Sequence, residues 1–311
     1  MVGCCGATSP SKLRMDGEGE AAKTPTTPDE KKKQDDDKKG VTFDKDVVYR
    51  DSAAPPLQAG MSSPDRGRYS QTRPKAIPQF ETGPAPRPAD EVLNNDETAI
   101  IVVDFQHDFM EGGNLAVSGA DYGKYKDDVV AFVEKCRGKG RVIVWSQDWH
   151  PEDHQSFAKN HDGGVPFTQK KLSRPKESGE IIDTDQTLWP VHCVQGSKGA
   201  EFVTEVREGE FVQQKGTMPP WDSYSAFMDD GGHPTGLADH LKNKGIKATV
   251  CFGLALDFCV YFTAKDSCQS GFSTYWIPEL CRGIDPEFEN SKYDTAGCYT
   301  ITLPEANKAL E

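Results

Sequence analysis

Three side chains suited to nucleophilic and acid–base chemistry each follow a predicted β-strand. The strands and the side chains that follow them are Thr98–Val103 with Asp104, Phe211–Gln214 with Lys215, and Ala248–Phe252 with Cys259. In α/β folds with parallel strands, the carboxyl ends of the strands line the crevice that binds ligands. A carboxylate, an ammonium group and a thiol that meet there can shift one another's pKa values and turn the thiol into a nucleophile.

The stretch Gly253–Thr263 reads GLALDFCVYFT and predicts a tight turn that opens a helix. Cys259 would then lie in the first helical turn, where unpaired N–H groups and the positive end of the helix dipole favour a thiolate. Taken alone, Cys259 fits a buried core thiol better. Asp104 alone equally fits a turn residue or a helix cap, and Lys215 alone fits a solvated lysine. The hypothesis of a catalytic set therefore depends on the three occurring together.

A second group of polar residues has the types and spacing of metal ligands. Asp148 and His150 follow the predicted strand Arg141–Ser146 and project to the same side of an extended chain, and His192 follows after a long loop. Imidazole and carboxylate ligands suit Zn²⁺, Fe²⁺ or Mn²⁺ better than Ca²⁺. The sequence leaves His154 open as a fourth ligand, a supporting partner or a solvated loop residue.

The elements that must position these residues predict a mostly parallel sheet of six strands. The remaining strands are predicted at Ser273–Ile277 and Cys298–Thr302, and helices at Lys124–Cys136, Gly236–Lys244, Cys259–Gln269 and Pro304–Leu310. The polar stretch Asp285–Ala296 also has helical character. A strand, a helix and a second strand within residues 98–146 form a βαβ unit, which implies parallel strands and a right-handed crossover.

The composition limits the classes of partner and compartment. A net charge of −13 and a pI of about 5.1 argue against nucleic acid or an anionic membrane as the main partner. No apolar run approaches the roughly 20 residues that span a bilayer. Nine cysteines without zinc-ribbon spacing, and no apolar signal region, favour free thiols in a reducing cytosol. We therefore expect a cytoplasmic protein without stable membrane insertion.

Residues 1–95 differ from the rest of the chain, because they contain charge blocks and Pro-rich segments and lack a sustained apolar period. Such a composition buries too little apolar surface to offset the entropy of ordering, so we expect a disordered tail before a folded domain of residues 96–311. Cys4 and Cys5 allow a minority hypothesis of membrane tethering by acylation. Val2 removes the usual signal for N-myristoylation.

Six motifs together resemble the nicotinamidase/pyrazinamidase branch of the isochorismatase-like cysteine hydrolases. They are IIVVDFQHDF (100–109), WSQDWHPEDHQSFAKNH (145–161), WPVHCVQGS (189–197), QQKG (213–216), YSAF (224–227) and GLALDFCV (253–260). They follow the family's order across Asp96–Leu303, and the DWHP and WPVHC motifs are specific to this branch. The resemblance implies a three-layer α/β/α hydrolase domain. It also implies that nicotinamide is hydrolysed to nicotinate and ammonia, through a cysteine thioester, in NAD salvage.

The resemblance assigns a role to each matching residue. Cys259 would be the nucleophile, Asp104 the base and Lys215 the cation that stabilises the anions. The implied ligands of one divalent ion, most simply Zn²⁺ with Fe²⁺ or Mn²⁺ as alternatives, are Asp148, His150 and His192. The implied substrate-binding residues are Phe109 and Trp189 on the two faces of the pyridine ring, Tyr224 in the pocket wall, and Ala255. The backbone N–H of Ala255, which follows a cis peptide bond in the family, would join that of Cys259 in an oxyanion hole.

Three positions depart from the family's usual pattern. His107 stands where Asn is usual and adds a titratable group at the pocket mouth, while Leu256 and Phe258 replace residues that are often small or polar. Besides nicotinamide hydrolysis, two alternative functions are considered. One is a related amidase for another small amide, and the other is a pseudoenzyme whose tail is an interaction module. A homo-oligomer stays open, and no nucleic-acid partner is expected.

Overall fold

The computed structural model describes residues 85–176 and 178–311, and within them the predicted six-stranded sheet is present. The strands lie in the order β5-β2-β1-β6-β7-β8, and every neighbouring pair is parallel. Their bounds are β1 Thr98–Val103, β2 Val142–Asp148, β5 Phe211–Lys215, β6 Ala248–Leu254, β7 Ser273–Arg282 and β8 Tyr299–Thr300. The parallel arrangement places the residues that follow β1, β2, β5 and β6 at one edge of the sheet.

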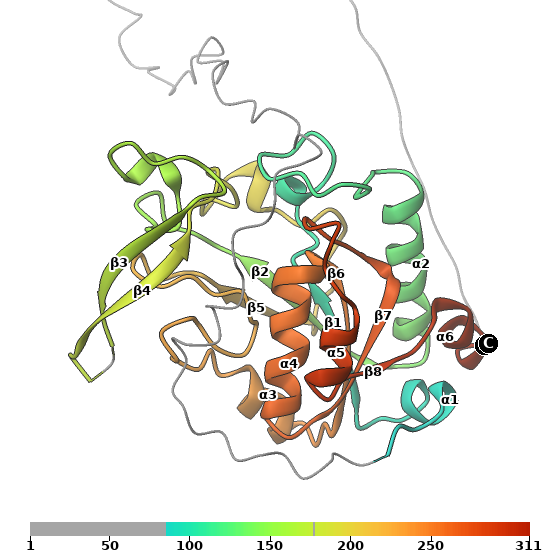
Figure 1. Cartoon of the computed structure of the whole chain (residues 1–311). Coiled ribbons are helices and arrows are strands. Elements are labelled where there is room, and N and C mark those ends of the chain that lie inside the picture. The colour runs from blue at the N-terminus through green and yellow to red at the C-terminus, as the bar shows by residue number, and fades with distance from the viewer. Residues whose placement is uncertain (1–84, 177) are drawn as a thin grey trace, which may run out of the picture. The chain divides into compact units, whose positions relative to one another are not determined.

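Helices cover both faces of the sheet and complete the three-layer architecture (Figure 1). The α-helices are α1 Ala89–Leu93, α2 Lys124–Gly138, α3 Leu237–Asn243, α4 Tyr261–Gln269, α5 Ser291–Thr295 and α6 Leu303–Ala309. On one face, Phe132 of α2 packs edge-on against Phe252, with 5.3 Å between the ring centroids. On the other face, the Ser267 hydroxyl of α4 lies 2.7 Å from that of Thr249. Phe252 and Thr249, three residues apart on β6, therefore anchor the two helical layers.

The central strands explain why this sheet forms. All residues of β1 and β6 are buried, as expected of apolar runs covered by helices on both sides. The two strands pair in register from Thr98 opposite Ala248 to Val103 opposite Gly253. Asp104, the residue after β1, thus lies level with the end of β6, which leads into the Cys259 turn.

The segment between the DWHP and WPVHC motifs was expected to be a long loop, and this expectation was wrong. It contains an antiparallel hairpin of β3 Gln169–Pro175 and β4 Ile181–Thr187, separate from the main sheet (Figure 1). The strands are polar and largely exposed at their tip, so they lack the apolar alternation that predicts a strand. The hairpin is anchored by buried polar side chains, among them Arg174 and Gln186.

The folded region begins before Asp96, because α1 lies inside the segment assigned to the tail. Val92 and Leu93 of α1 are fully buried, and the Asn94 side-chain amide donates to the carbonyl of Ala309, the last residue of α6, at 2.8 Å. The remainder of the predicted tail, residues 1–84 with Cys4 and Cys5, lies outside the described residues. Among the residues that are described, none of the helices combines the length and apolar character needed to cross a membrane.

Short helical turns connect the strands to the site. Three are 3₁₀ turns, at His107–Phe109, Ala158–Asn160 and Lys198–Ala200, and one is a π-helical turn, Leu256–Val260. The helix predicted from Cys259 therefore begins as this π turn and continues as α4 from Tyr261.

Candidate active site and metal centre

The carboxyl ends of four adjacent strands bring the three predicted catalytic residues together. Lys215 ends β5, and its Nζ lies 2.9 Å from Asp104 Oδ2 and 3.4 Å from Cys259 Sγ. The same Nζ pairs with the carboxylate of Asp148, the last residue of β2, and donates to the carbonyl of Ser223 at 2.9 Å. All of these side chains are buried, so the ammonium group is held by protein atoms rather than by water.

The buried lysine is charged. Burial lowers the pKa of Lys215, but the carboxylates of Asp104 and Asp148 outweigh that effect and raise the pKa well above its ordinary value. Burial likewise raises the pKa of Asp148, but the charges on Lys215 and His150 outweigh it and hold the pKa well below its usual range. Lys215 and Asp148 therefore form a buried ion pair.

Asp104 and Cys259 lie beside this ion pair, and both have raised pKa values. Burial, more than any other cause, raises the pKa of Asp104, although Lys215 and a 2.6 Å hydrogen bond from the Ser146 hydroxyl oppose the rise. Burial also raises the pKa of the Cys259 thiol well above its ordinary value, and Asp104 and Asp148 add to the rise. Burial and the two carboxylates thus act against the thiolate that the helix dipole and Lys215 favour, so the thiol needs a base.

The turn that carries Cys259 is held at its start by hydrogen bonds. The Leu254–Ala255 peptide is cis, as the resemblance implied. The buried carboxylate of Asp257 accepts from the backbone N–H groups of Ile284 at 3.0 Å and Asp285 at 2.6 Å. The Tyr293 hydroxyl donates to the carbonyl of Leu256 at 2.7 Å.

The predicted metal ligands have a donor geometry that fits a small divalent ion. Nδ1 of His150 donates to the carbonyl of Gly216 at 2.9 Å, and Nδ1 of His192 donates to the carbonyl of Pro190 at 2.8 Å. The Nε2 of each ring faces Asp148 and lies 3.5 Å (His150) or 3.7 Å (His192) from Asp148 Oδ2. Donor atoms about 2.1 Å from one tetrahedral ion lie about 3.4 Å apart. These three residues can therefore hold one ion with little movement.

His154 is buried beside this donor set and is not a solvated loop residue. Its Nδ1 lies 2.7 Å from the Ser156 hydroxyl and its Nε2 lies 3.1 Å from the carbonyl of Trp221. Burial and the neighbouring His150 lower the pKa of His154 to about 3. His150, His154 and Asp222 also offer three donor atoms within 4.8 Å. Because both nitrogens of His154 already have protein partners, the geometry favours a supporting role against the His150 ring, 4.4 Å away.

Two buried side chains that the sequence analysis did not single out fix the backbone of the site. The Gln106 amide donates to the carbonyl of Asp148 and accepts from its N–H, both at 2.8 Å. The Asp108 carboxylate accepts from the N–H of Cys193 at 2.7 Å, directly after His192. Both lie inside the motif that contains Asp104, and that proximity was the available signal.

The predicted substrate-binding aromatics fall into two groups. The Trp189 indole N–H donates to the Tyr224 hydroxyl at 3.1 Å, and the Trp189 and Phe258 rings lie 5.0 Å apart. Phe109 lies instead against His192, with 5.6 Å between ring centroids. Phe258, a departure from the family pattern, thus packs on the predicted pocket wall.

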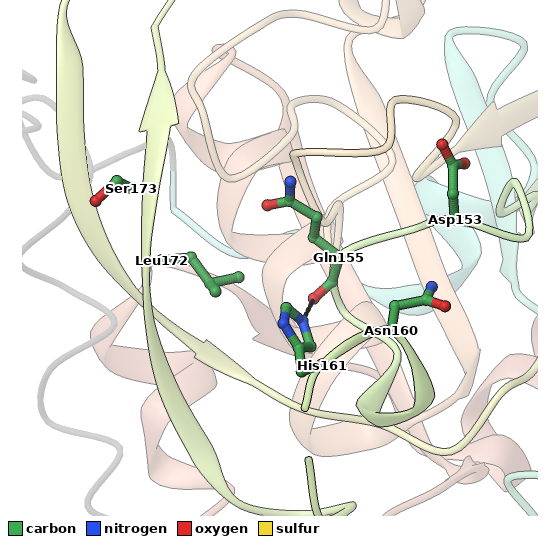
Figure 2. A pocket seen from close by; sticks show the side chains of 6 residues that line it. All are labelled: Asp153, Gln155, Asn160, His161, Leu172 and Ser173. Atoms are coloured by element: carbon green, nitrogen blue, oxygen red, sulfur yellow. Dashed lines mark hydrogen bonds between the residues drawn. The ribbon is translucent and has the colours of Figure 1, made fainter. Parts of the chain in front are cut away.

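A surface pocket of about 540 Å³ lies elsewhere, between the hairpin and the loop after His150. Figure 2 shows its lining residues, Asp153, Gln155, Asn160, His161, Leu172 and Ser173, and the hydrogen bond from His161 to the Gln155 carbonyl. None of these residues belongs to the buried set around Lys215. The pocket is therefore separate from the candidate active site.

A family model, a curated relative and a solved structure all relate this chain to the same protein family. Residues 98–303 match the isochorismatase domain model. The nicotinamidase of Acinetobacter baylyi is 40% identical over 190 residues, which cover 60% of this chain and 82% of that protein. A pyrazinamidase of Pyrococcus horikoshii in complex with zinc is 34% identical, with a TM-score of 0.53, over 66% of this chain and 99% of that one.

A third comparison extends the likeness to a eukaryotic enzyme. The structure of the yeast nicotinamidase bound to the inhibitor nicotinaldehyde has a TM-score of 0.60 and 27% identity, and the match covers 66% of this chain and 99% of that one. Because the family model spans most of the chain and the match covers 82% to 99% of these relatives, the chain belongs to the isochorismatase family, in the group that contains the nicotinamidases.

Proposed function

We propose that this chain is an amidohydrolase that converts nicotinamide to nicotinate and ammonia, with Cys259 as nucleophile. The observation that carries the proposal is the position of Lys215 Nζ, 2.9 Å from Asp104 and 3.4 Å from Cys259 Sγ, beside a donor set for one divalent ion. The nicotinamidases among the relatives support the substrate. The product would enter pyridine-nucleotide salvage. The free cysteines of the described region support a reducing compartment such as the cytoplasm.

In the first half-reaction, Asp104 acts as the general base. Its carboxylate takes the proton from the Cys259 thiol, and the thiolate attacks the carboxamide carbon. The backbone N–H groups of Ala255 and Cys259 stabilise the oxyanion of the tetrahedral intermediate. Asp104 then gives the proton to the departing ammonia, which leaves a thioester on Cys259.

In the second half-reaction, Asp104 accepts a proton from water, which attacks the thioester carbon. Collapse of the intermediate breaks the C–S bond, returns the proton to Cys259 and releases nicotinic acid, which ionises to nicotinate. Lys215 keeps its charge throughout and stabilises Asp104 and the transient thiolate. The high pKa of the resting thiol prevents a permanently reactive thiolate, so the nucleophile forms only when the base acts.

Asp148, His150 and His192 would hold the divalent ion, which we propose to be Zn²⁺ because two imidazoles and one carboxylate suit it. When bound, the ion supplies a Lewis acid for a ring nitrogen and for water. Trp189 and Tyr224 form one wall of the proposed ring pocket, with Phe109 on the His192 side. A nicotinamide ring held between these side chains would direct its carboxamide toward Cys259.

The direct test is ammonia release from nicotinamide by the purified full-length protein, with the metal content measured in parallel. We expect turnover in the wild type, and loss of at least about a thousandfold in Cys259→Ala, because no other group replaces the nucleophile. Cys136→Ala, at a buried thiol of α2, is the matched control and should stay near wild-type activity. Chelation should remove activity, and Zn²⁺ should restore it.

Two results would overturn the proposal. Undiminished ammonia release by Cys259→Ala would exclude the cysteine mechanism. A folded, metal-loaded wild type that releases no ammonia from nicotinamide but hydrolyses another small amide would exclude the substrate and leave the chemistry intact.

A further inference from the structure

Cys268 and Cys298 place two thiols side by side, outside the proposed active site. Cys268 lies in the last turn of α4 and Cys298 directly precedes β8, 30 residues later, yet their Sγ atoms are 3.5 Å apart. Both thiols are free. Cys268 is partly exposed, whereas Cys298 is buried. The fold thus brings together one accessible and one protected sulfur.

The two sulfurs are inequivalent. The hydrogen bond with Cys298 lowers the pKa of Cys268, and this effect outweighs burial. The same hydrogen bond, followed by burial, raises the pKa of Cys298. Either sulfur can donate in this hydrogen bond, and Cys268 is the partly exposed sulfur that a solute can reach. The buried thiols of Cys136 and Cys281 differ from Cys268, because burial raises their pKa to about 12.

We propose that Cys268 and Cys298 form a modification site that hydrogen peroxide converts into a disulfide. The Cys268 thiolate attacks one peroxide oxygen, the O–O bond breaks, and the products are a sulfenic acid and hydroxide. The Cys298 thiol then attacks the Cys268 sulfur, the S–O bond breaks, and water leaves. The two sulfurs lose two electrons in total, and the peroxide is reduced to two waters.

The geometry favours the second step over further oxidation of Cys268. The sulfurs must approach from 3.5 Å to a bond of about 2.05 Å, a movement within reach of side-chain rotation. The sulfenic acid would form in contact with its resolving thiol, which is the arrangement of reversible redox sites. The disulfide would join the end of α4 to the start of β8.

Peptide mapping of the full-length protein tests the site without reference to turnover. The protein is treated with hydrogen peroxide, its remaining thiols are alkylated, and the tryptic peptides are analysed by mass spectrometry. Cleavage after Lys265, Arg282, Lys292 and Lys308 gives peptides 266–282 and 293–308. We expect these two peptides to be cross-linked, with a loss of about 2 Da relative to their summed masses, and to separate on reduction.

Three variants define the connection. Cys268→Ser and Cys298→Ser should lose the cross-link, and Cys298→Ser should accumulate a sulfenic acid on Cys268 that a cyclic diketone traps. Cys281→Ser is the matched control, because Cys281 lies in the same tryptic peptide as Cys268, and it should keep the cross-link. If a variant does not fold, fragment ions of the wild-type cross-link still distinguish Cys268 from Cys281.

Three results would overturn the proposal. The first is a cross-link through Cys281, and the second is conversion of wild-type Cys268 to a sulfinic acid without a cross-link. The third is complete alkylation of both thiols after a peroxide dose that fully oxidises a small free thiol in the same sample.

Discussion

The carboxyl edge of the sheet and the β3–β4 hairpin both support Lys215, but by different means. At the sheet edge, Asp104 and Asp148 pair directly with the ammonium group. On the hairpin side, the support passes through three hydrogen bonds. Gln186 donates to Asp222 at 3.0 Å, Asp222 accepts from the Ser223 N–H at 2.9 Å, and the Ser223 carbonyl accepts from Lys215 at 2.9 Å.

The two regions therefore control different properties of the site around Lys215. The sheet edge supplies the charges that fix the protonation states of the site, whereas the hairpin fixes where one backbone carbonyl lies. Substitutions should therefore have smaller effects on the reaction as their distance from Lys215, counted in hydrogen bonds, increases. The predictions below test that order.

Lys215→Met should have the largest effect, because it leaves the buried carboxylates of Asp104 and Asp148 without their cation. We expect loss of activity and a decrease of about 3–5 kcal/mol in the free energy of unfolding, measured in urea. Lys198→Met is the control, since Lys198 pairs with Glu201 on the surface and should cost less than about 1 kcal/mol. Equal destabilisation by the two variants would show that the buried charges are not coupled to folding.

Gly216→Ala should come next, because it acts on His150, a proposed metal ligand, rather than on the lysine. A Cβ at this position would lie 2.3 Å from Cε1 of His150, and φ is +62°. We expect metal affinity, measured by competition with a chromogenic chelator, to fall by about 10–100-fold. Gly163→Ala has a similar φ of +66° but open space around it, so it controls for backbone strain alone. Unchanged affinity in Gly216→Ala would contradict the predicted role of His150.

Gln186→Leu tests the hairpin. It removes the acceptor of the buried Arg174 guanidinium, a 2.7 Å hydrogen bond, and the donor to Asp222. We expect a loss of about 1–3 kcal/mol in the free energy of unfolding, and a decrease in kcat of less than about tenfold. Ser173→Ala, which removes an exposed hydrogen bond on the same hairpin, should change neither quantity appreciably. A loss of kcat as large as that of Lys215→Met would remove the distinction between the two regions.

His107→Asn should have the smallest effect. We expect this substitution to change only how the free energy of unfolding depends on pH. Burial, followed by the charge on Lys198, lowers the pKa of His107 in the folded protein, although Glu201 opposes the change. The unfolded chain therefore binds more protons than the folded one below pH about 6.5, so acidification through that region destabilises the wild type. The urea midpoint should fall less between pH 7.5 and 5.5 in His107→Asn than in the wild type. An identical fall in both proteins would assign the pH dependence to other groups.

The same two regions mark how far the sequence could predict the structure. Runs that are apolar on both faces, such as Thr98–Val103 and Ala248–Leu254, fit only a strand covered by helices on both sides. The residues that follow such strands meet at one edge of the sheet. The hairpin strands QKKLSRP and IIDTDQT have no such signature. Their burial depends on Arg174 and Gln186 finding partners on a distant loop, and a polar side chain gives no local indication of being buried.

The candidate site shows the same division. Asp104, Lys215 and Cys259 could be proposed because they follow predicted strands. The protonation state of Cys259 could not, because it depends on burial and on two carboxylates from other strands. Gln106 was overlooked for a related reason. Its side chain holds the backbone of Asp148 through two hydrogen bonds, and these bonds exist only once the sheet has formed.

The contact between Asn94 and Ala309 has a consequence for attachment. It brings the two ends of the described region together near the amino end of β1, whereas the reacting groups follow its carboxyl end. A strand of 6 residues separates these levels by about 20 Å. A fusion partner or surface tether joined after α6 would therefore be anchored at the amino edge of the sheet, remote from Asp104 and Lys215.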